Sequence, residues 1–168
     1  MMRKLGFSLI ELMVVVVIIG VLAAVGVPKL FGIIAKSKAS EVSAAAGTYV
    51  RLQQAYINEA GKLGSWHLIG YTIGESSERY AGTTSNFFYS GAAALKADSA
   101  TTSETAVGWF AANLAKLNEC EAQTTSTGEG EAHWKLTMSI VDEKDISWVS
   151  YVAGTCVPLT PSFGNIGQ

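Results

Sequence analysis

Apolar residues fill the chain almost without interruption from Phe7 to Val27, and the only polar side chains in this run are Ser8 and Glu11. A helix of this length rises roughly 30 Å, which is the thickness of the hydrocarbon core of a bilayer. The pattern therefore predicts a hydrophobic helix over residues 7–28 that crosses a membrane or packs against other helices.

Residues 29–61 continue the predicted helix with one apolar face and one polar face. Apolar residues recur at steps of three and four, as they do along one side of a helix. They are Val42, Ala45, Tyr49, Leu52 and Tyr56. The polar side carries Lys36, Lys38, Glu41, Arg51 and Glu59. Gly61 and Gly64 predict the end of the helix,. Counted from Phe7, the predicted spine is roughly 80 Å long.

Residues 62–168 have the texture of a β-rich domain, with short apolar runs separated by Gly, Ser, Thr and Asn. The runs predicted as strands are Trp66–Ile73, Asn86–Tyr89, Val107–Leu114, Trp134–Ile140 and Trp148–Val152. The fourth run alternates between apolar and polar residues, which is typical of a half-buried strand in an antiparallel sheet. The expected fold class is α+β, a helical spine packed against a C-terminal antiparallel sheet.

The segments between these runs are predicted to be irregular. Gly74–Thr84 and Ala97–Thr105 are polar and indicate surface loops, and Ala92–Ala97 indicates a helical turn. The tail after Cys156 contains two prolines and two glycines, so we expect it to lie along the surface or to be disordered,.

Charge narrows the class of partner. The 168 residues include 12 Lys+Arg and 14 Asp+Glu, a formal net charge of −2, and loss of Arg3 and Lys4 with a leader would leave 10 basic residues and −4. This balance excludes a nucleic-acid surface that depends on positive charge.

Motifs for catalysis are missing from the sequence, which contains no G-x-S-x-G, H-E-x-x-H or phosphate loop,. His67 and His133 have no nucleophile or metal ligand at motif spacing, and the tryptophans are predicted to lie in the core. The acidic turn Asp142–Asp145 offers oxygen ligands for Ca²⁺, but four residues without the rest of a site favour a solvated turn,. We expect no enzymatic activity, no metal and no cofactor.

Cys120 and Cys156 are the only cysteines. In a chain whose bulk lies beyond a membrane span they are candidates for one disulfide formed in an oxidising compartment. Two buried thiols are the alternative, and a metal pair is disfavoured because neither cysteine has a second ligand at close spacing. A disulfide would close the loop 120–156 and stabilise the fold by roughly 4 kcal/mol.

Glu11 is the anomaly of the apolar run, because a carboxylate inside a membrane costs on the order of 3 kcal/mol. Upstream lies a short basic leader, Met1–Gly6, that ends in glycine. A cut between Gly6 and Phe7 would create an α-amino group that is mostly charged at neutral pH. This amine and Glu11 would attract each other in low dielectric, within one helix or between chains in a staggered array of parallel helices.

The run Lys4-Leu-Gly-Phe-Ser-Leu-Ile-Glu11, followed by the apolar segment, resembles the class III signal of type IV pilins and of type II secretion pseudopilins. The resemblance implies that a membrane-embedded prepilin peptidase cuts between Gly6 and Phe7 and N-methylates Phe7. It also implies that Glu11 registers each subunit on its neighbour. It covers the first third of the chain and matches the family motif without departure.

The resemblance further implies the pilin fold. In filaments of this family the segment between a glycine and a proline at the positions of Gly20 and Pro28 can melt into extended chain, whereas for an isolated subunit we expect a continuous helix with a gentle kink. The loop 120–156 would resemble the disulfide-bounded C-terminal loop of pilins, with a tail longer than that family usually leaves.

The function expected from these features is that of a structural subunit, most like a type IVa major pilin. The precursor would lie in the bacterial inner membrane, and after processing it would polymerise with identical subunits into an extracellular helical filament for adhesion, motility or uptake. Its partners would be the prepilin peptidase and the pilus assembly platform, with no specific nucleic acid. The alternatives are a major pseudopilin, a minor or DNA-uptake pilin, and a membrane-anchored extracytoplasmic binding domain. A plain membrane anchor or an ordinary secretory signal is disfavoured by Glu11.

Overall fold

The computed structural model describes residues 6–91, 105–124, 128–142 and 145–168. The chain divides into two compact units, Met1–Ile34 and Ala35–Gln168, which we call the N-terminal unit and the head. One helix, α1 (Leu9–Ala60), contributes residues to both. The α+β class predicted from the sequence is confirmed by this helix and by the antiparallel sheet that follows it.

Helix α1 begins two residues after the predicted start at Phe7 and ends one residue before the predicted end at Gly61. Pro28 lies inside it, and the helix is continuous through this residue, as expected for an isolated subunit. Gly61 follows its last residue with φ 64°, and the Gly61 N–H donates to the carbonyl of Ile57 at 2.8 Å. Glycine adopts this left-handed conformation without steric cost, so it ends the helix where the sequence predicts.

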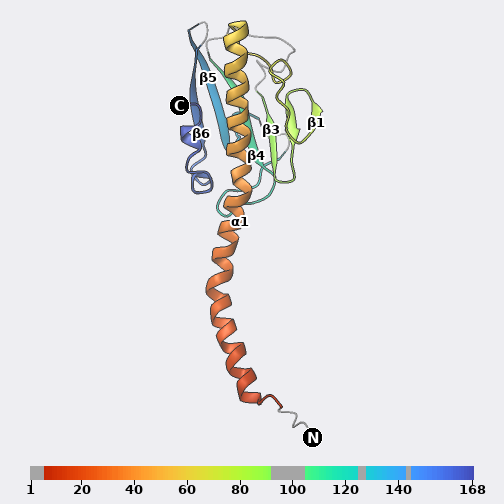
Figure 1. Cartoon of the computed structure of the whole chain (residues 1–168), viewed down its shortest axis with the longest axis vertical. Helices are drawn as coiled ribbons and strands as arrows, with labels where there is room; N and C mark the ends of the chain where they lie inside the picture. Colours follow the sequence, from red (N-terminus) through yellow and green to blue (C-terminus); the bar gives the residue numbers. More distant parts are fainter. Residues whose placement is uncertain (1–5, 92–104, 125–127, 143–144) are drawn as a thin grey trace. The chain divides into compact units, whose positions relative to one another are not determined.

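Six strands among the described residues form one antiparallel sheet in which neighbours in sequence are neighbours in space (Figure 1). The strands are β1 (Glu75–Glu78), β2 (Ala81–Thr83), β3 (Phe87–Ser90), β4 (Thr105–Asn113), β5 (Trp134–Asp142) and β6 (Asp145–Val152). Two short 3₁₀ helices follow, η2 (Val157–Leu159) and η3 (Phe163–Asn165).

The core of the head lies between the sheet and the part of α1 that belongs to the head. Tyr49 of α1 is at its centre with no exposed surface, and the ring centroids of Trp66, Tyr71 and Trp148 lie 5.4 to 6.3 Å from its own. All four tryptophans are buried, as predicted. The helix residues that face this core are Ala35, Ala39, Val42, Ala45, Ala46, Tyr49, Gln53 and Ile57.

A bulge in β4 lets the helix approach the sheet closely. Val107 pairs with Thr137 and Trp109 with Leu136, so Gly108 is the extra residue between them,. A Cβ atom at Gly108 would overlap the hydroxyl of Tyr49 and the end of Met138. The Gly108 carbonyl accepts a hydrogen bond from Nε1 of Trp66 at 3.1 Å. Glycine is therefore required here for space.

Two expectations for residues 66–84 are wrong. Trp66–Ile73 forms turns in place of a strand, because Gly70 has φ 67° and reverses the chain while Trp66, Ile69 and Tyr71 remain buried. Gly74–Thr84, expected as a loop, contains strands β1 and β2. The polar sequence of β1 carries no alternation that could reveal an edge strand,.

The helix face also differs from the predicted one at five positions. Gln53 and Ile57 are fully buried, whereas Leu52 and Tyr56 are only partly buried. The Gln53 amide donates to the Gly64 carbonyl at 3.2 Å and accepts from the Gly64 N–H at 2.9 Å. Glu41, assigned to the polar face, is half-buried and its Oε1 accepts hydrogen bonds from Tyr89 at 2.8 Å and Thr84 at 2.6 Å.

The segment after Cys156 lies along the surface, one of the two expectations, and is anchored to the head by three buried side chains. Leu159, Thr160 and Phe163 are buried in the head. Pro158 and Gly164 lie within the two 3₁₀ helices, whose buried residues are Leu159 and Phe163. The helical turn expected at Ala92–Ala97, most of the loop at Ala97–Thr105 and the middle of the turn Asp142–Asp145 lie outside the described residues.

Candidate functional site

The described residues of the N-terminal unit present a largely apolar surface. Its large apolar side chains from Phe7 to Ile34 are all exposed, from 42% for Ile34 to 87% for Leu9. Soluble monomers rarely expose a contiguous apolar patch larger than a few hundred Å². The segment therefore requires an apolar environment that the chain itself does not supply.

Helix α1 is long and apolar enough to cross a membrane by length and composition. Among the described residues it is the one helix that meets this test, with an 18-residue window of mean hydropathy 2.9 near the N-terminus. A signal sequence can be equally long and apolar. The residues at the start of the segment therefore decide between a signal sequence and a lasting membrane helix.

Ser8 and Glu11 form a capping interaction at the start of α1. The backbone N–H of Ser8 donates to Oε2 of Glu11 at 2.9 Å. Ser8 precedes the first helical residue and Glu11 lies three residues further on, the positions of a capping box,. The carboxylate also lies in the first turn, where the helix dipole favours negative charge,. The S-x-x-E pattern of residues 8–11 is the sequence signal for this cap, beside the pairing of Glu11 with an amine that the sequence predicts,.

The predicted processing residues lie just before the helix. Gly6 and Phe7 are outside α1 and exposed, Phe7 to 82%. In the uncut chain Phe7 has a peptide nitrogen in place of an α-amino group, so the Glu11 carboxylate bonds to Ser8. Phe7 and Glu11 line one shallow groove along the helix, together with Ile10, Val14 and Val15. A new amine at Phe7 would thus begin on the side of the helix that carries Glu11.

Gly20 and Pro28 lie within the regular part of α1. A Cβ atom at Gly20 or Gly26 would meet no other atom within 4 Å, so neither glycine is required for packing in the single chain. Their effect on the helix is confined to lowering its intrinsic stability. Melting of this segment in an assembly remains a prediction.

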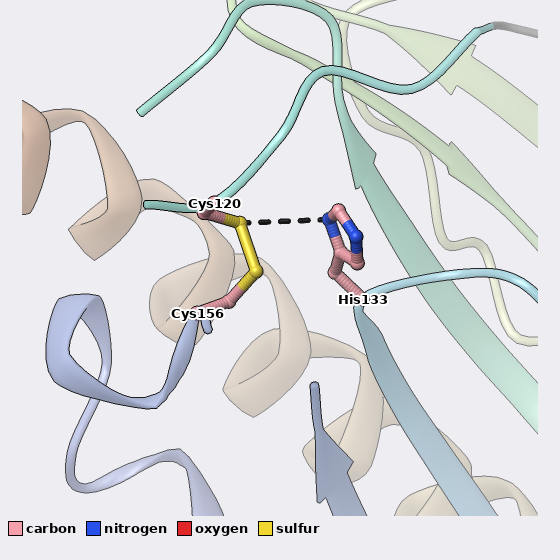
Figure 2. A group of neighbouring side chains, drawn as sticks. All are labelled: Cys120, His133 and Cys156. Atoms are coloured by element: carbon pink, nitrogen blue, oxygen red, sulfur yellow. Dashed lines mark hydrogen bonds between the residues drawn. A yellow bond between two sulfur atoms is a disulfide. The ribbon is translucent and has the colours of Figure 1, made fainter. Parts of the chain in front are cut away.

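A second cluster of functional side chains surrounds the disulfide of the head. Cys120 and Cys156 are joined and fully buried, with their Cα atoms 4.9 Å apart. The sequence leaves a disulfide, two buried thiols and a metal pair as alternatives. The structure contains the disulfide. Nδ1 of His133 lies 3.5 Å from Sγ of Cys120 (Figure 2). Sulfurs bonded to each other are not thiolates, so the three residues together do not make a thiolate metal site.

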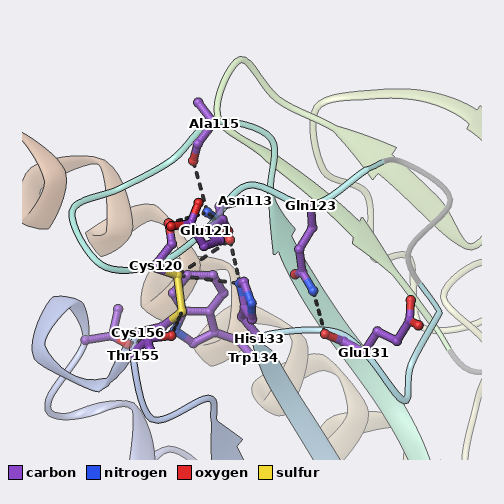
Figure 3. Close-up of a disulfide and its surroundings, with 11 residues drawn as sticks. Asn113, Ala115, Cys120, Glu121, Gln123, Glu131, His133, Trp134, Thr155 and Cys156 are labelled. Carbon is purple, nitrogen blue, oxygen red and sulfur yellow. Dashed lines mark hydrogen bonds between the residues drawn. A yellow bond between two sulfur atoms is a disulfide. The ribbon is translucent and has the colours of Figure 1, made fainter.

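Asn113 organises the loop that carries Cys120. It is the last residue of β4, and its Nδ2 donates to the carbonyls of Ala115 at 3.0 Å, Cys120 at 3.3 Å and Glu121 at 2.7 Å (Figure 3). Because Nδ2 is the donor in all three bonds, the other amide atom, Oδ1, is the one that faces Nδ1 of His133, at 2.7 Å. His133 therefore donates through Nδ1.

Burial lowers the pKa of His133, which favours the neutral ring. The sequence gives no signal for this pair, because Asn113 and His133 lie 20 residues apart and meet only through the pairing of β4 with β5.

Comparisons with known proteins give one family match and several similar proteins. Residues 1–27 match the family described as the prokaryotic N-terminal methylation motif. The type IV major pilin protein PilA of Myxococcus xanthus (strain DK1622) is 42% identical over 57 residues, which are 34% of this chain and 26% of that protein. The type IV major fimbrial protein FimA of Dichelobacter nodosus is 54% identical over 50 residues, 29% of this chain and 31% of that protein.

The aligned part thus spans about a quarter to a third of these curated relatives. No solved structure gives a significant match to the chain. The resemblance to type IV pilins, predicted from residues 4–11, is confirmed by these matches for the N-terminal part of the chain.

Proposed function

We propose that this protein is a structural subunit of a type IV pilus, which polymerises through the N-terminal part of α1 into a helical filament. The single observation that carries the proposal is the exposed apolar part of α1, which follows Gly6 and Phe7, contains Glu11 and falls largely within the matched N-terminal methylation motif. The role is structural and not enzymatic, in keeping with the pilins and fimbrial proteins that it resembles.

The apolar surface supports two successive environments for the same side chains. As a precursor the helix lies in the inner membrane, where lipid covers the apolar residues between Phe7 and Pro28. In the filament, equivalent helices of neighbouring subunits cover them. The contact is heterologous and does not close on itself, which yields a fibre and not a ring.

Glu11 takes a different partner in each environment. In the uncut precursor its carboxylate accepts the hydrogen bond from the Ser8 N–H, which lowers the cost of placing it in a membrane,. The prepilin peptidase cuts between Gly6 and Phe7 and methylates the Phe7 nitrogen, and the new cation then competes for the same carboxylate. In the filament this cation belongs to the next subunit, so Glu11 sets the axial register.

The remaining assignments follow from that assembly. The segment from Gly20 to Pro28 extends when subunits pack, because its glycines and proline stabilise the helix least. The head lies outside the cytoplasm, where its disulfide forms, and the assembly platform of the pilus extracts the processed subunit from the membrane. Adhesion, motility or uptake is the use of the finished filament.

Mass spectrometry of the chain purified from cell-surface filaments tests the proposal. We expect a mature protein that begins at Phe7 and carries one methyl group on its nitrogen. A Gly6→Ala control should leave unprocessed precursor in the membrane. An N-terminus close to Val27 would identify an ordinary secretory signal and contradict the proposal. A correctly processed protein that never enters a surface filament would point to a pseudopilin.

A further inference from the structure

Residues 157–168 contact three of the four tryptophans of the head in turn. Thr160 accepts a hydrogen bond from Nε1 of Trp134 at 2.8 Å. The ring of Phe163 stacks on Trp109 with a centroid distance of 6.2 Å and an interplanar angle of 28°. Gly167 lies so close to Trp148 that a Cβ atom there would overlap the indole. The segment thus covers inner-face residues of β4, β5 and β6.

The backbone of this segment forms a local unit. Its described backbone hydrogen bonds join residues 153–168 to one another, as in Leu159 N–H to Cys156 at 3.0 Å and Phe163 N–H to Thr160 at 3.0 Å. Contact with the sheet is made by side chains, including the Ser150 hydroxyl, which donates to the Gly164 carbonyl at 2.8 Å. Because no strand ladder binds it, the segment can separate from the head without unpairing the sheet.

The disulfide holds the first turn of the segment in place. Cys156 immediately precedes η2, and its partner Cys120 lies in the loop that Asn113 fixes through three carbonyls. Of the twelve residues that follow, Phe163 has the largest buried side chain, with no exposed surface. A covalent tie at one end and one aromatic anchor near the middle therefore hold the segment.

We propose that residues 157–168 form a strap that closes the core of the head by seating Phe163 against Trp109, and that the Cys120–Cys156 disulfide is the tie that keeps it closed. The strap opens as a unit when either attachment is removed, while β4, β5 and β6 stay paired. An open strap exposes Trp109 and Trp134. This behaviour belongs to the head alone and does not depend on polymerisation.

Hydrogen exchange of the full chain in detergent micelles tests the strap. Its probes are the N–H groups of Leu159, Thr160, Phe163 and Ile166, all in turn hydrogen bonds, with amides of β5 as the reference. Phe163→Ala should speed exchange of the strap by at least about tenfold and leave β5 within about twofold. The matched control is Val157→Ala in the same segment, where the side chain is 43% exposed, and it should change neither.

The disulfide is tested by the double variant Cys120→Ala/Cys156→Ala. We expect exchange in the strap to rise by at least about tenfold more than exchange in β5. Equal acceleration of strap and β5 in this variant or in Phe163→Ala would overturn the proposal, because the segment would then be part of one cooperative core. Unchanged strap exchange would overturn it as well.

Tryptophan fluorescence provides a second readout. Phe163→Ala should shift the emission to longer wavelength, because Trp109 becomes hydrated. The same substitution in a Trp109→Phe background should give a smaller shift, because Trp134 is then the indole that the open strap newly exposes. A shift of equal size in both backgrounds would assign the change to general loosening of the head and contradict the strap.

Discussion

The two parts of α1 belong to one helix and differ in what covers them. From Leu9 to Ile34 every large apolar side chain is exposed, whereas from Ala35 to Ala60 the apolar residues at steps of three and four are buried against the sheet. A continuous apolar pattern cannot be covered by one side of a domain, so its partner must come from outside the chain. A periodic pattern can be covered by a single sheet, so its partner lies within the chain.

The same contrast appears in their polar groups. In the head, Glu41 and Gln53 are bonded to Tyr89, Thr84 and Gly64, all residues outside the helix. In the N-terminal part, Glu11 bonds only to the helix start at Ser8 among the described residues. The Glu11 carboxylate can exchange the Ser8 N–H for a charged partner without disturbing the head. The hydrogen bonds of Glu41 are part of the folded head and would be lost only with it.

The largest effect should come from Glu11→Ala, which should prevent assembly through the N-terminal part of α1 and leave the head intact. The Phe7 amine would enter the filament core without a counter-charge, at a cost of roughly 3–5 kcal/mol, or about a thousandfold in the association constant. Membrane insertion and cleavage should continue. The measurement is the yield of surface filaments beside the ratio of processed to unprocessed chain.

Glu11→Gln is the matched control for this prediction. Its amide oxygen still accepts a hydrogen bond from Ser8 N–H but carries no charge. If charge pairing matters, Glu11→Gln should fail like Glu11→Ala; if capping matters, it should assemble normally. Normal filaments from Glu11→Ala itself would show that the carboxylate does not register subunits.

A smaller effect, confined to the head, is expected from Gly108→Ala. The added methyl group would overlap Tyr49 and Met138, and overpacking of this kind typically destabilises by about 1–3 kcal/mol,. Chemical denaturation of the full chain in detergent measures it. Gly128→Ala, where a Cβ atom meets nothing within 4 Å, should be nearly neutral. Equal stability of the two variants would contradict the close helix–sheet approach.

Alkaline pH should destabilise the head gradually. Burial raises the pKa of Tyr49, Tyr71 and Tyr89 above the ordinary value, with the hydrogen bond to Glu41 adding to the shift at Tyr89. Above about pH 10 the unfolded chain therefore releases protons that the folded chain retains, and stability falls as pH rises. Each such tyrosine removes about 1.4 kcal/mol per pH unit.

Denaturation midpoints between about pH 9 and pH 11 test this sign. Tyr49→Phe should make the fall less steep, because it removes one of the buried phenols whose pKa is raised. The substitution itself should be mild, because the Tyr49 hydroxyl is hydrogen-bonded only to the sulfur of Met138 among the described residues. Tyr151→Phe, at a position 49% exposed, should leave the slope unchanged. Constant stability across this range would show that the buried phenols do not control it.

The sequence by itself determined the features that depend on neighbours along the chain. The apolar run, the end of α1 at Gly61 and the strand Trp134–Ile140 each follow from local pattern or from a residue with special backbone freedom. Gly6, Phe7 and Glu11 were identified for the same reason, since their chemistry lies within five residues of one another. The S-x-x-E cap at Ser8 belongs to this class, although its local role was overlooked.

Only the tertiary structure decided which residues meet across the head. Asn113 reaches His133 because β4 pairs with β5, Glu41 is drawn inward by Tyr89 of β3, and Gly108 is required because Tyr49 lies opposite it. The sequence of the strap leaves a surface segment and a disordered tail as alternatives, because prolines and glycines weaken any regular pattern. The anchor that orders it, Phe163, is held by Trp109, more than fifty residues away in sequence. Contacts of this range depend on how strands are ordered and paired, which hydrophobic periodicity along a single segment does not encode.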